Sequence, residues 1–486
     1  MRPTAKRTAR SRRSAGARRS AGARRSAGAR RSARTRRSAR VAVVALLALV
    51  AGLLSGCGSS GGGGPDTVRV SYKQSMDNNV KIMDEHLARV KAQFEKAHAG
   101  KKVELVPIKA PDADYYTKVQ QLMRSPKTAP DLVYEDTFLI NADITAGLLR
   151  PLDDYLADWP DWARYEDSAK EAARGQDGKV YGVPDGTDTR GLWFNKEVFA
   201  KAGLPADWRP KDWDELLAAA RTIKRRVPDV IPLNVFTGKG AGEAATMQGF
   251  QMLLYGTGAD PLYDPKREKW VTGSKGFRDA LEFVRTVYTE GLGPKASDAL
   301  DPNVATRVPG EWLPEGRLAI ALDGSWLGNN WVRGGGTPWP KWHEVLGQAP
   351  MPTQHGQSPG RVSMSGGWTW AIPAKAGNPD LAWEFVKVLS TRENSVDFHV
   401  ANAGIAVRKD VAADPKYRRS MPGVEFFTGL VEFTHYRPAL PVYPQVSTAI
   451  QEAMEHVTAG GTPPARAAAI YDERVRSISG GAVTGP

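Results

Sequence analysis

The sequence predicts an α/β protein, because strand-like and helix-like patterns alternate along the first folded stretch of the chain. Val68, Val70 and Tyr72 alternate with polar residues, as in a strand. From Val80 to Ala97 the apolar residues recur at spacings of three and four, which places them on one face of a helix. A second strand, a second helix and a third strand are predicted at residues 103–108, 115–123 and 131–134. Strands that alternate with helices in this way form a parallel sheet covered on both faces.

This sheet predicts where a ligand binds. In open α/β sheets, ligands lie beyond the carboxyl ends of the strands, which here places residues 71–79 and 135–138 on the binding edge. Glu135 and Asp136 lie where the third strand ends, so we predict that they contact a ligand. The alternative is that they are solvated surface charges, as most single acidic residues are.

The first 56 residues have the features of an export signal. Residues 1–40 carry 16 Lys and Arg and no acid, and residues 41–54 form an uncharged apolar run. A bilayer span needs about 20 residues, so this shorter run fits a signal peptide better. Cys57 is the only cysteine of the 486 residues and stands where a bacterial lipobox has its cysteine. We therefore predict a mature chain that begins at Cys57 and is lipid-anchored at the extracellular face of the cell membrane, the alternative being a lone buried cysteine.

Removal of this leader changes the charge of the protein. The whole chain has a net charge of +14, of which the leader supplies +16, so residues 57–486 carry −2. The net positive charge of the whole chain therefore gives no information about the partners of the folded part. No nucleic-acid partner is expected. Residues 57–65 are rich in Gly and Ser and are predicted to form a flexible tether.

Several short segments, in order along the chain, carry a family resemblance. They are Pro130–Tyr134, Ala146–Leu152, Tyr181–Pro184, Gly191–Phe199, Trp213–Leu216, Gly324–Trp326, and Ser365–Trp368 leading to Ala371–Pro373. Asn378 and Pro379 then begin a predicted helix, with Asn378 as its cap. Over residues 66–480 the chain resembles the family 1 extracellular solute-binding proteins, the maltose-binding-protein-like receptors of ABC importers.

The resemblance implies an α/β, two-lobe periplasmic-binding-protein fold of type II, the Venus-flytrap fold, with discontinuous lobes joined by a hinge. Residues 66–188 and 362–408 would form lobe 1, and residues 191–360 and 411–480 would form lobe 2. A solute would bind in the cleft and be buried when the hinge closes. The implied partners are the transmembrane permease subunits of an ABC importer with its cytoplasmic ATPase. The resemblance also implies a monomer without a cofactor.

The same resemblance implies aromatic ligand contacts. Sugar sites combine aromatic side chains, which cover the C–H faces of a ring, with polar side chains, which bind its hydroxyls. Trp326 matches a family position at which an aromatic residue stacks on sugar. Gly367 lets the backbone approach a ligand closely beside Trp368. A core position is the alternative for both indoles, and it is the expected position of Trp370.

Four further candidates are charged or aromatic. Asp188 matches an acidic sugar ligand of some relatives. Its neighbour Arg190 would either bind hydroxyls or pair with Asp188. Tyr436 and Tyr443 fall in the carboxyl-terminal region that supplies a closing aromatic residue in relatives.

An enzyme is not expected from this sequence. A glycosidase also places two carboxylates beside a sugar, but no segment here resembles a hydrolase signature, and no catalytic residue is predicted. The seven histidines form no close pair typical of a metal site, so no metal is predicted either. The predicted function is capture of a disaccharide or short oligosaccharide for import. The alternative is a receptor of the same fold for a polyol, a sugar phosphate or a small cation.

Overall fold

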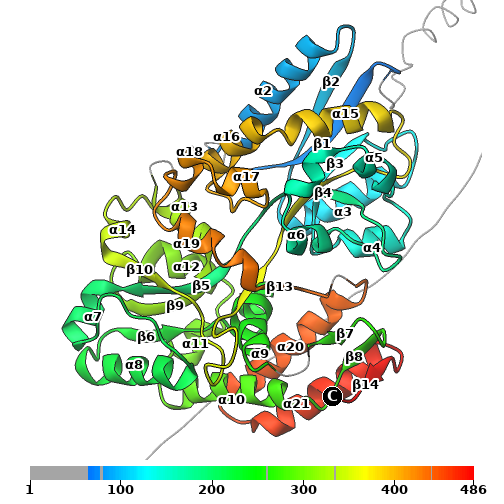
Figure 1. Ribbon diagram of the computed structural model, residues 1–486. Coiled ribbons are helices and arrows are strands. Elements are labelled where there is room, and N and C mark those ends of the chain that lie inside the picture. The colour runs from blue at the N-terminus through cyan, green and yellow to red at the C-terminus, as the bar shows by residue number, and fades with distance from the viewer. Residues whose placement is uncertain (1–63, 77–79, 259–260, 333–334, 439) are drawn as a thin grey trace, which may run out of the picture. The chain divides into compact units, whose positions relative to one another are not determined.

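The protein is described from a computed structural model (Figure 1). The structure describes residues 64–76, 80–258, 261–332, 335–438 and 440–486, so the predicted leader, Cys57 and most of the tether lie outside the described residues. The described residues all belong to one compact unit. None of their helices is both long and apolar enough to cross a membrane.

A five-stranded sheet, in the order β2-β1-β3-β12-β4, organises the part of the fold that we call lobe 1. Its strands are β1 (Thr67–Gln74), β2 (Lys102–Lys109), β3 (Leu132–Asp136), β4 (Gly182–Thr187) and β12 (Gly367–Ala371). β1 is parallel to β2 and β3, as predicted, whereas β12 is antiparallel to β3 and β4. The sheet is therefore mixed rather than wholly parallel. The reason is that β12 enters the sheet at the edge where β3 and β4 end, with Gly367 opposite Thr187.

Helices cover both faces of this sheet, as predicted (Figure 1). Leu132 and Tyr134 of β3 pack into one apolar cluster with α2 and α15, whereas Val133 packs into a second cluster with α3. This division follows from the two-residue period of a strand. The helices of lobe 1 are α2 (Ile82–Ala97), α3 (Asp112–Met123), α4 (Ile140–Thr145), α5 (Asp153–Ala157), η1 (Pro160–Arg164), α6 (Asp167–Ala172), α15 (Pro379–Leu389) and α16 (Arg392–Asn402).

The start of α15 differs in detail from the prediction. The helix begins at Pro379, but the side chain of Asn378 does not cap it. Its amide instead donates hydrogen bonds of 2.9 and 3.1 Å to the backbone oxygens of Thr67 and Gly64, and its backbone N–H donates to Asp131. Asn378 therefore ties α15 to the start of β1 rather than to its own first turn.

A four-stranded sheet, in the order β10-β5-β9-β6, organises the part that we call lobe 2. Its strands are β5 (Arg190–Asn195), β6 (Ile231–Asn234), β9 (Leu318–Gly324) and β10 (Leu346–Ala349). A small sheet joins β7 (Tyr263–Asp264), β8 (Lys269–Val271) and β14 (Val483–Thr484). Every residue of β5 and β9 is buried, which identifies them as the centre of the lobe.

The remaining helices surround this second sheet or lie beside the hinge. The longer ones are α7 (Lys196–Ala202), α8 (Trp213–Arg226), α10 (Lys275–Thr289), α20 (Tyr443–Thr458) and α21 (Pro464–Ile478). The helix α9 (Met252–Gly256) has five residues. The shorter ones are α11 (Ala296–Ala299), α12 (Val304–Arg307), α13 (Gly328–Trp331), α14 (Trp342–Val345), α17 (Lys409–Ala412), α18 (Pro415–Arg418) and α19 (Val424–Thr428). The 3-10 and π-helical turns are η2 (Lys239–Ala241), η3 (Ala245–Gln251), η4 (Val308–Trp312), η5 (Ser325–Leu327) and η6 (Val431–Phe433).

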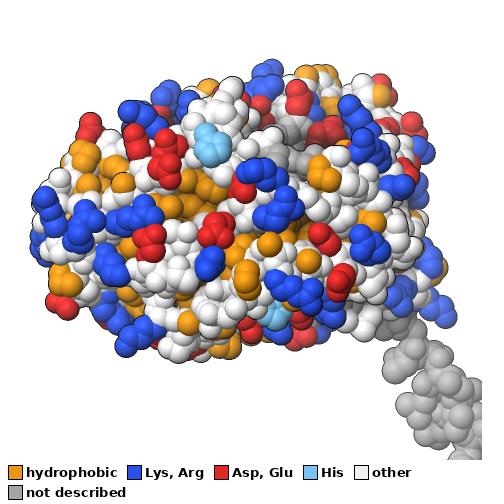
Figure 2. Space-filling model, turned by 90° about the horizontal axis from the view of Figure 1, so that it is seen from below, with side chains coloured by type: hydrophobic (Ala, Val, Ile, Leu, Met, Phe, Trp, Pro, Cys, Tyr) orange, Lys and Arg blue, Asp and Glu red, His pale blue; other side chains and the backbone are white. Residues whose placement is uncertain are grey.

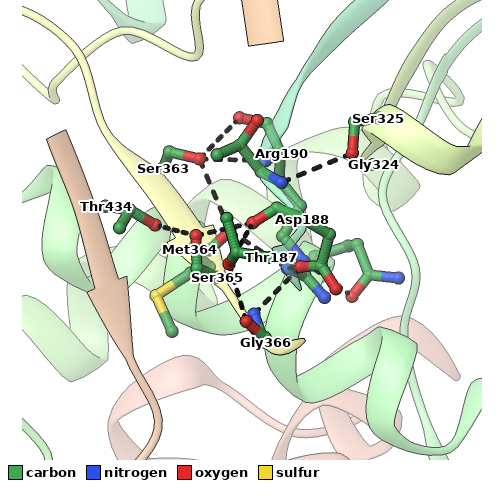
Figure 3. Close-up of polar contacts among 12 residues, drawn as sticks. Thr187, Asp188, Arg190, Gly324, Ser325, Ser363, Met364, Ser365, Gly366 and Thr434 are labelled. Atoms are coloured by element: carbon green, nitrogen blue, oxygen red, sulfur yellow. Dashed lines mark hydrogen bonds and ion pairs between the residues drawn. The ribbon is translucent and has the colours of Figure 1, made fainter. Parts of the chain in front are cut away.

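Segments far apart in sequence meet at the hinge between the two sheets (Figure 3). They are the link between β4 and β5, the strand β11 (Ser363–Ser365), and the strand β13 (Thr434–Tyr436), which pairs in parallel with β11. Hydroxyl groups connect them: Ser365 donates to the backbone oxygen of Asp188 at 2.6 Å, and Thr434 donates to Ser365 at 2.6 Å. The lobe boundaries expected from the resemblance stay a prediction.

Side chains of both charges are interspersed over the face of the molecule seen from below in Figure 2. Neither sign forms a continuous field on this face, which agrees with the net charge of −2 for residues 57–486.

Candidate functional site

A cavity of about 320 Å³ lies beside the hinge and is lined by residues of both lobes. We call it the aromatic cavity. Four of the predicted ligand residues, Trp326, Trp368, Gly367 and Asp188, lie on its wall. Its other lining residues are Tyr134, Asp185, Gly186, Thr187, Ser325, Asn329, Phe398, His399, Asn402, Ala403 and Gly404.

Trp326 is held in place by its own motif. It follows β9 in the turn η5 and is only partly buried. The ring of Trp326 fills the space that a Cβ atom at position 324 would occupy. Position 324 therefore accommodates only glycine. The guanidinium carbon of Arg190 lies 4.8 Å from the ring centroid, which is cation–π geometry. Gly324 and Arg190 therefore fix the plane of the indole at the cavity wall.

Trp368 is the first aromatic residue of β12 and is also partly buried. Its ring stacks on Tyr134, with centroids 4.8 Å apart and planes at 9°. The hydroxyl of Tyr134 donates a 2.9 Å hydrogen bond to Asp185, and burial raises the pKa of this carboxyl to about 6. Trp370, two residues on, is fully buried in the core, as predicted.

Asp188 and Arg190 form an ion pair at the hinge (Figure 3). The side chain of Asp188 remains 28% exposed, whereas that of Arg190 is only 7% exposed. Asp188 accepts a 2.9 Å hydrogen bond from the backbone N–H of Gly366, and Arg190 donates to the backbone oxygen of Met364 at 3.0 Å. Of the two roles considered for Arg190, the structure shows the pairing one. Of these two residues, Asp188 lines the aromatic cavity and Arg190 does not.

Glu135 and Asp136 have different surroundings, although they are adjacent. Glu135 is buried with Asp143 beside it, and burial, followed by the charge of Asp143, raises the pKa of Glu135 well above its usual range. Asp136 accepts a 2.6 Å hydrogen bond from the hydroxyl of Tyr116. It also forms an ion pair with Arg437 at 3.4 Å. Glu135 does not line the aromatic cavity, and neither does Asp136.

The two candidate tyrosines are also separated. Tyr436 ends β13, and its hydroxyl lies 3.4 Å from the hydroxyl of Thr187. Tyr443 is fully buried, where it donates to Glu243 at 2.8 Å and accepts from Gln251 at 2.7 Å. In this conformation Tyr443 has no surface to offer a ligand.

Tyr436 lines a second cavity, of about 400 Å³. Its walls come from the end of β3, the loop after α6, the β7–β8 turn and the segment after β13. Arg437 is the charged hinge residue on this wall, and no pattern in the sequence singles it out.

The aromatic cavity also contains residues that the sequence analysis did not select. Asn329 and Asn402 lie on its wall from the two lobes, and the amide of Asn329 donates to the backbone oxygen of Asn402 at 3.0 Å. His399 is buried, which lowers its pKa to about 4, and its Nδ1 has no hydrogen-bond partner. The Asn329 position could have been noticed because it follows Trp326 by three residues, about one helical turn. Within the described residues, no group of three or more His, Cys, Asp or Glu could hold a metal ion.

The chain is similar to known protein families and solved structures. The profile of the family described as "Bacterial extracellular solute-binding protein" matches residues 81–396. The chain belongs to this family. A galactooligosaccharide-binding protein of Bacillus subtilis is 23% identical over 385 residues, which cover 77% of this chain and 82% of that protein.

Solved structures of the family share the fold. An ABC transporter solute-binding protein from Thermotoga lettingae, bound with α-D-tagatose, is 25% identical with a TM-score of 0.68, covering 85% of this chain and 99% of that chain. A cyclic α-maltosyl-1,6-maltose-binding protein from Arthrobacter globiformis is 22% identical with a TM-score of 0.70, covering 85% and 99%. The two-lobe fold expected from the sequence is thereby confirmed, and the protein is an extracellular solute-binding protein of the ABC transporter type.

Proposed function

We propose that this solute-binding protein captures a disaccharide or short oligosaccharide in the aromatic cavity. The observation that carries the proposal is the presence of two indoles, Trp326 and Trp368, and two carboxyl side chains, Asp185 and Asp188, on the wall of a single cavity. Indoles cover the C–H faces of a sugar ring, and a carboxylate accepts hydrogen bonds from its hydroxyls. The cavity volume of about 320 Å³ falls within the range of small-molecule sites.

The position of the cavity supports a transport role. Trp368 comes from lobe 1 and Trp326 from lobe 2, so a ligand in contact with both has a different affinity for open and closed arrangements. Such a ligand shifts the population of lobe arrangements by its differential affinity. A permease that reads the lobe arrangement can therefore distinguish loaded from empty receptor. We therefore propose that the receptor delivers the sugar to the permease subunits of an ABC importer.

The relatives support a receptor rather than an enzyme. The Bacillus subtilis relative is named for the galactooligosaccharide that it binds, and the GacH receptor of Streptomyces glaucescens was crystallised with acarbose. One structural neighbour, from Agrobacterium radiobacter, holds ribitol, so a polyol belongs in any ligand screen.

A thermal-shift screen tests the proposal. The panel contains galacto-oligosaccharides, maltose, maltotetraose, tagatose, ribitol, glucose 6-phosphate and Mg²⁺. We expect a dose-dependent rise in melting temperature with one or more of the oligosaccharides. Calorimetry should then give one site per chain, and chromatography should recover the sugar unchanged. A shift with ribitol, glucose 6-phosphate or Mg²⁺ alone would replace the sugar assignment, and cleaved sugar would contradict the receptor role.

We also propose that the protein is held at the extracellular face of the cell membrane by a lipid on Cys57. The support is the sequence: an apolar run that is too short for a span, followed by the only cysteine of the chain and a Gly/Ser tether. A tether of this composition is flexible and lets the folded part reach a permease in the same membrane.

A further inference from the structure

Arg437 joins the two lobes across the hinge, and the function proposed above does not use it. It follows β13 directly and precedes α20, which packs in lobe 2. Its Nη2 lies 3.4 Å from Oδ1 of Asp136, at the end of β3 in lobe 1. Its Nη1 lies 3.6 Å from Oε1 of Glu243 in lobe 2. The two nitrogens of one guanidinium therefore face carboxylates of different lobes.

The surroundings of this ion pair are largely closed to water. The side chains of Arg437 and Asp136 are only 11% and 14% exposed. The guanidinium carbon lies 4.7 Å from the ring centroid of Phe138, and this ring makes an edge contact of 5.8 Å with Tyr443 of lobe 2. Removing one partner of such a pair leaves the other charge buried and unpaired, which is strongly unfavourable.

The two carboxylates differ in the hydrogen bonds that they would keep if Arg437 were removed. Glu243 would keep its hydrogen bonds from Tyr443, at 2.8 Å, and from Ser447, at 2.5 Å. Asp136 would keep the Tyr116 hydroxyl and the backbone N–H of Phe138, which are neutral donors. Burial raises the pKa of Asp136, and the charge of Arg437 is the largest opposing effect. The charge of Asp136 is therefore the one that depends on Arg437.

We propose that Arg437 is a latch of the hinge. Held by Glu243 on lobe 2, it pairs with Asp136 on lobe 1 and so favours the lobe arrangement described here over arrangements in which the lobes have moved apart. When the lobes separate, water replaces each partner of the pair. The latch thus sets how easily the protein opens, whatever solute it binds. A lysine would present one ammonium nitrogen to the two carboxylates, whereas the guanidinium presents a separate nitrogen to each.

Distance measurements between spin labels test the latch on the full chain without any ligand. Cys57→Ser removes the only cysteine, and Gln121→Cys on α3 and Lys266→Cys on the β7–β8 turn introduce one exposed label site on each lobe. Arg437→Gln should shift the distance distribution to longer separations. Arg361→Gln is the matched control, because Arg361 is exposed beside β11 and stacks on Phe433 at 4.5 Å.

A compensating variant makes the test specific for the ion pair. Asp136→Asn removes the charge that Arg437→Gln leaves unpaired. Its one amide oxygen can still accept from the backbone N–H of Phe138, and its NH2 group then faces the Tyr116 hydroxyl, which can accept a hydrogen bond. The double variant Asp136→Asn with Arg437→Gln should therefore return toward the wild-type distribution. If Arg437→Gln fails to fold by circular dichroism, Asp136→Asn alone provides the test and should lengthen the separation by a smaller amount. If the folded single variants, Arg437→Gln and Asp136→Asn, give distance distributions that superimpose on that of the wild type, the latch is overturned. Since no sugar is present, this result is independent of the ligand screen.

Discussion

Truncation of Trp326 is the sharpest test of the proposed sugar site. The indole lies on the wall of the aromatic cavity and is fixed from behind by Gly324 and Arg190. Trp326→Ala removes the surface on which a sugar ring would stack, while the fold around β9 retains its buried strand residues. Affinity should therefore fall more than stability.

The magnitude follows from the part of the ring that faces the cavity. A Trp side chain contributes roughly 150–250 Å² on full burial, and one accessible face is less than half of this, about 80 Å². At roughly 25 cal/mol per Å² of apolar surface, loss of this face costs about 2 kcal/mol of binding free energy. This corresponds to a roughly thirtyfold rise in the dissociation constant. Trp326→Phe should give an intermediate value because it keeps a smaller ring.

Calorimetric titration with the sugar found in the screen, together with the melting temperature of the same variant, measures both effects. Trp339→Ala is a matched control, because Trp339 is also partly buried in lobe 2 and packs on Trp331 at 5.7 Å but does not line the cavity. We expect this control to lower the melting temperature without changing the affinity. If Trp326→Ala behaves like Trp339→Ala, the indole is a packing residue and the stacking argument is refuted.

Three further predictions concern closure, pH and anchoring. Sugar at about a hundred times its dissociation constant should raise the free energy of unfolding by ~2.7 kcal/mol and reduce the radius of gyration in solution scattering; stabilisation without compaction would reject closure. Burial raises the pKa of Asp323 to about 7, so the stability that this carboxyl contributes is complete below its unfolded value of about 4 and is lost as pH rises through 7. Asp323→Asn should accordingly flatten the fall in melting temperature between about pH 4 and pH 7, and an unchanged slope would count against this. Mass spectrometry of protein from membranes should find a lipid on Cys57 and none in Cys57→Ser, and an unmodified thiol on the wild-type protein would exclude the anchor.

Local patterns were sufficient to predict the first elements of lobe 1. Strand alternation and the three-and-four spacing of apolar residues placed β1, α2, β2, α3 and β3 close to their observed bounds. The position of β12 between β3 and β4 could not be predicted in this way. It depends on pairing between Trp368 and Asp136, which lie more than two hundred residues apart in sequence.

The sequence predicted the residues of the candidate site less completely than it predicted the fold. Trp326, Trp368, Gly367 and Asp188 line one cavity, and whether they bind a ligand stays a prediction. Glu135 is buried because β3 extends to Asp136, so that strand alternation turns Glu135 to the face opposite Tyr134. Once the strand end is known, this is simple to derive, but strand ends are the least certain part of a sequence pattern.

Arg437, in contrast, could not be selected from the sequence. Its importance arises from partners that converge only in three dimensions, Asp136 from the amino-terminal part of the chain and Glu243 from the middle. No local signal near residue 437 indicates a buried cation.

The insertion of β12 has a consequence for how the chain folds during synthesis. β4 pairs only with β12 among the strands of its sheet, so a chain that ends before Gly367 has β4 without a partner. The first sheet therefore cannot be completed until the first segment of lobe 2, residues 191–360, has emerged, although most strands of the sheet come before this segment. Completion of this sheet therefore depends on residues far along the chain. This dependence also means that an amino-terminal fragment ending near residue 190 should expose strand edges and aggregate rather than fold as an independent domain.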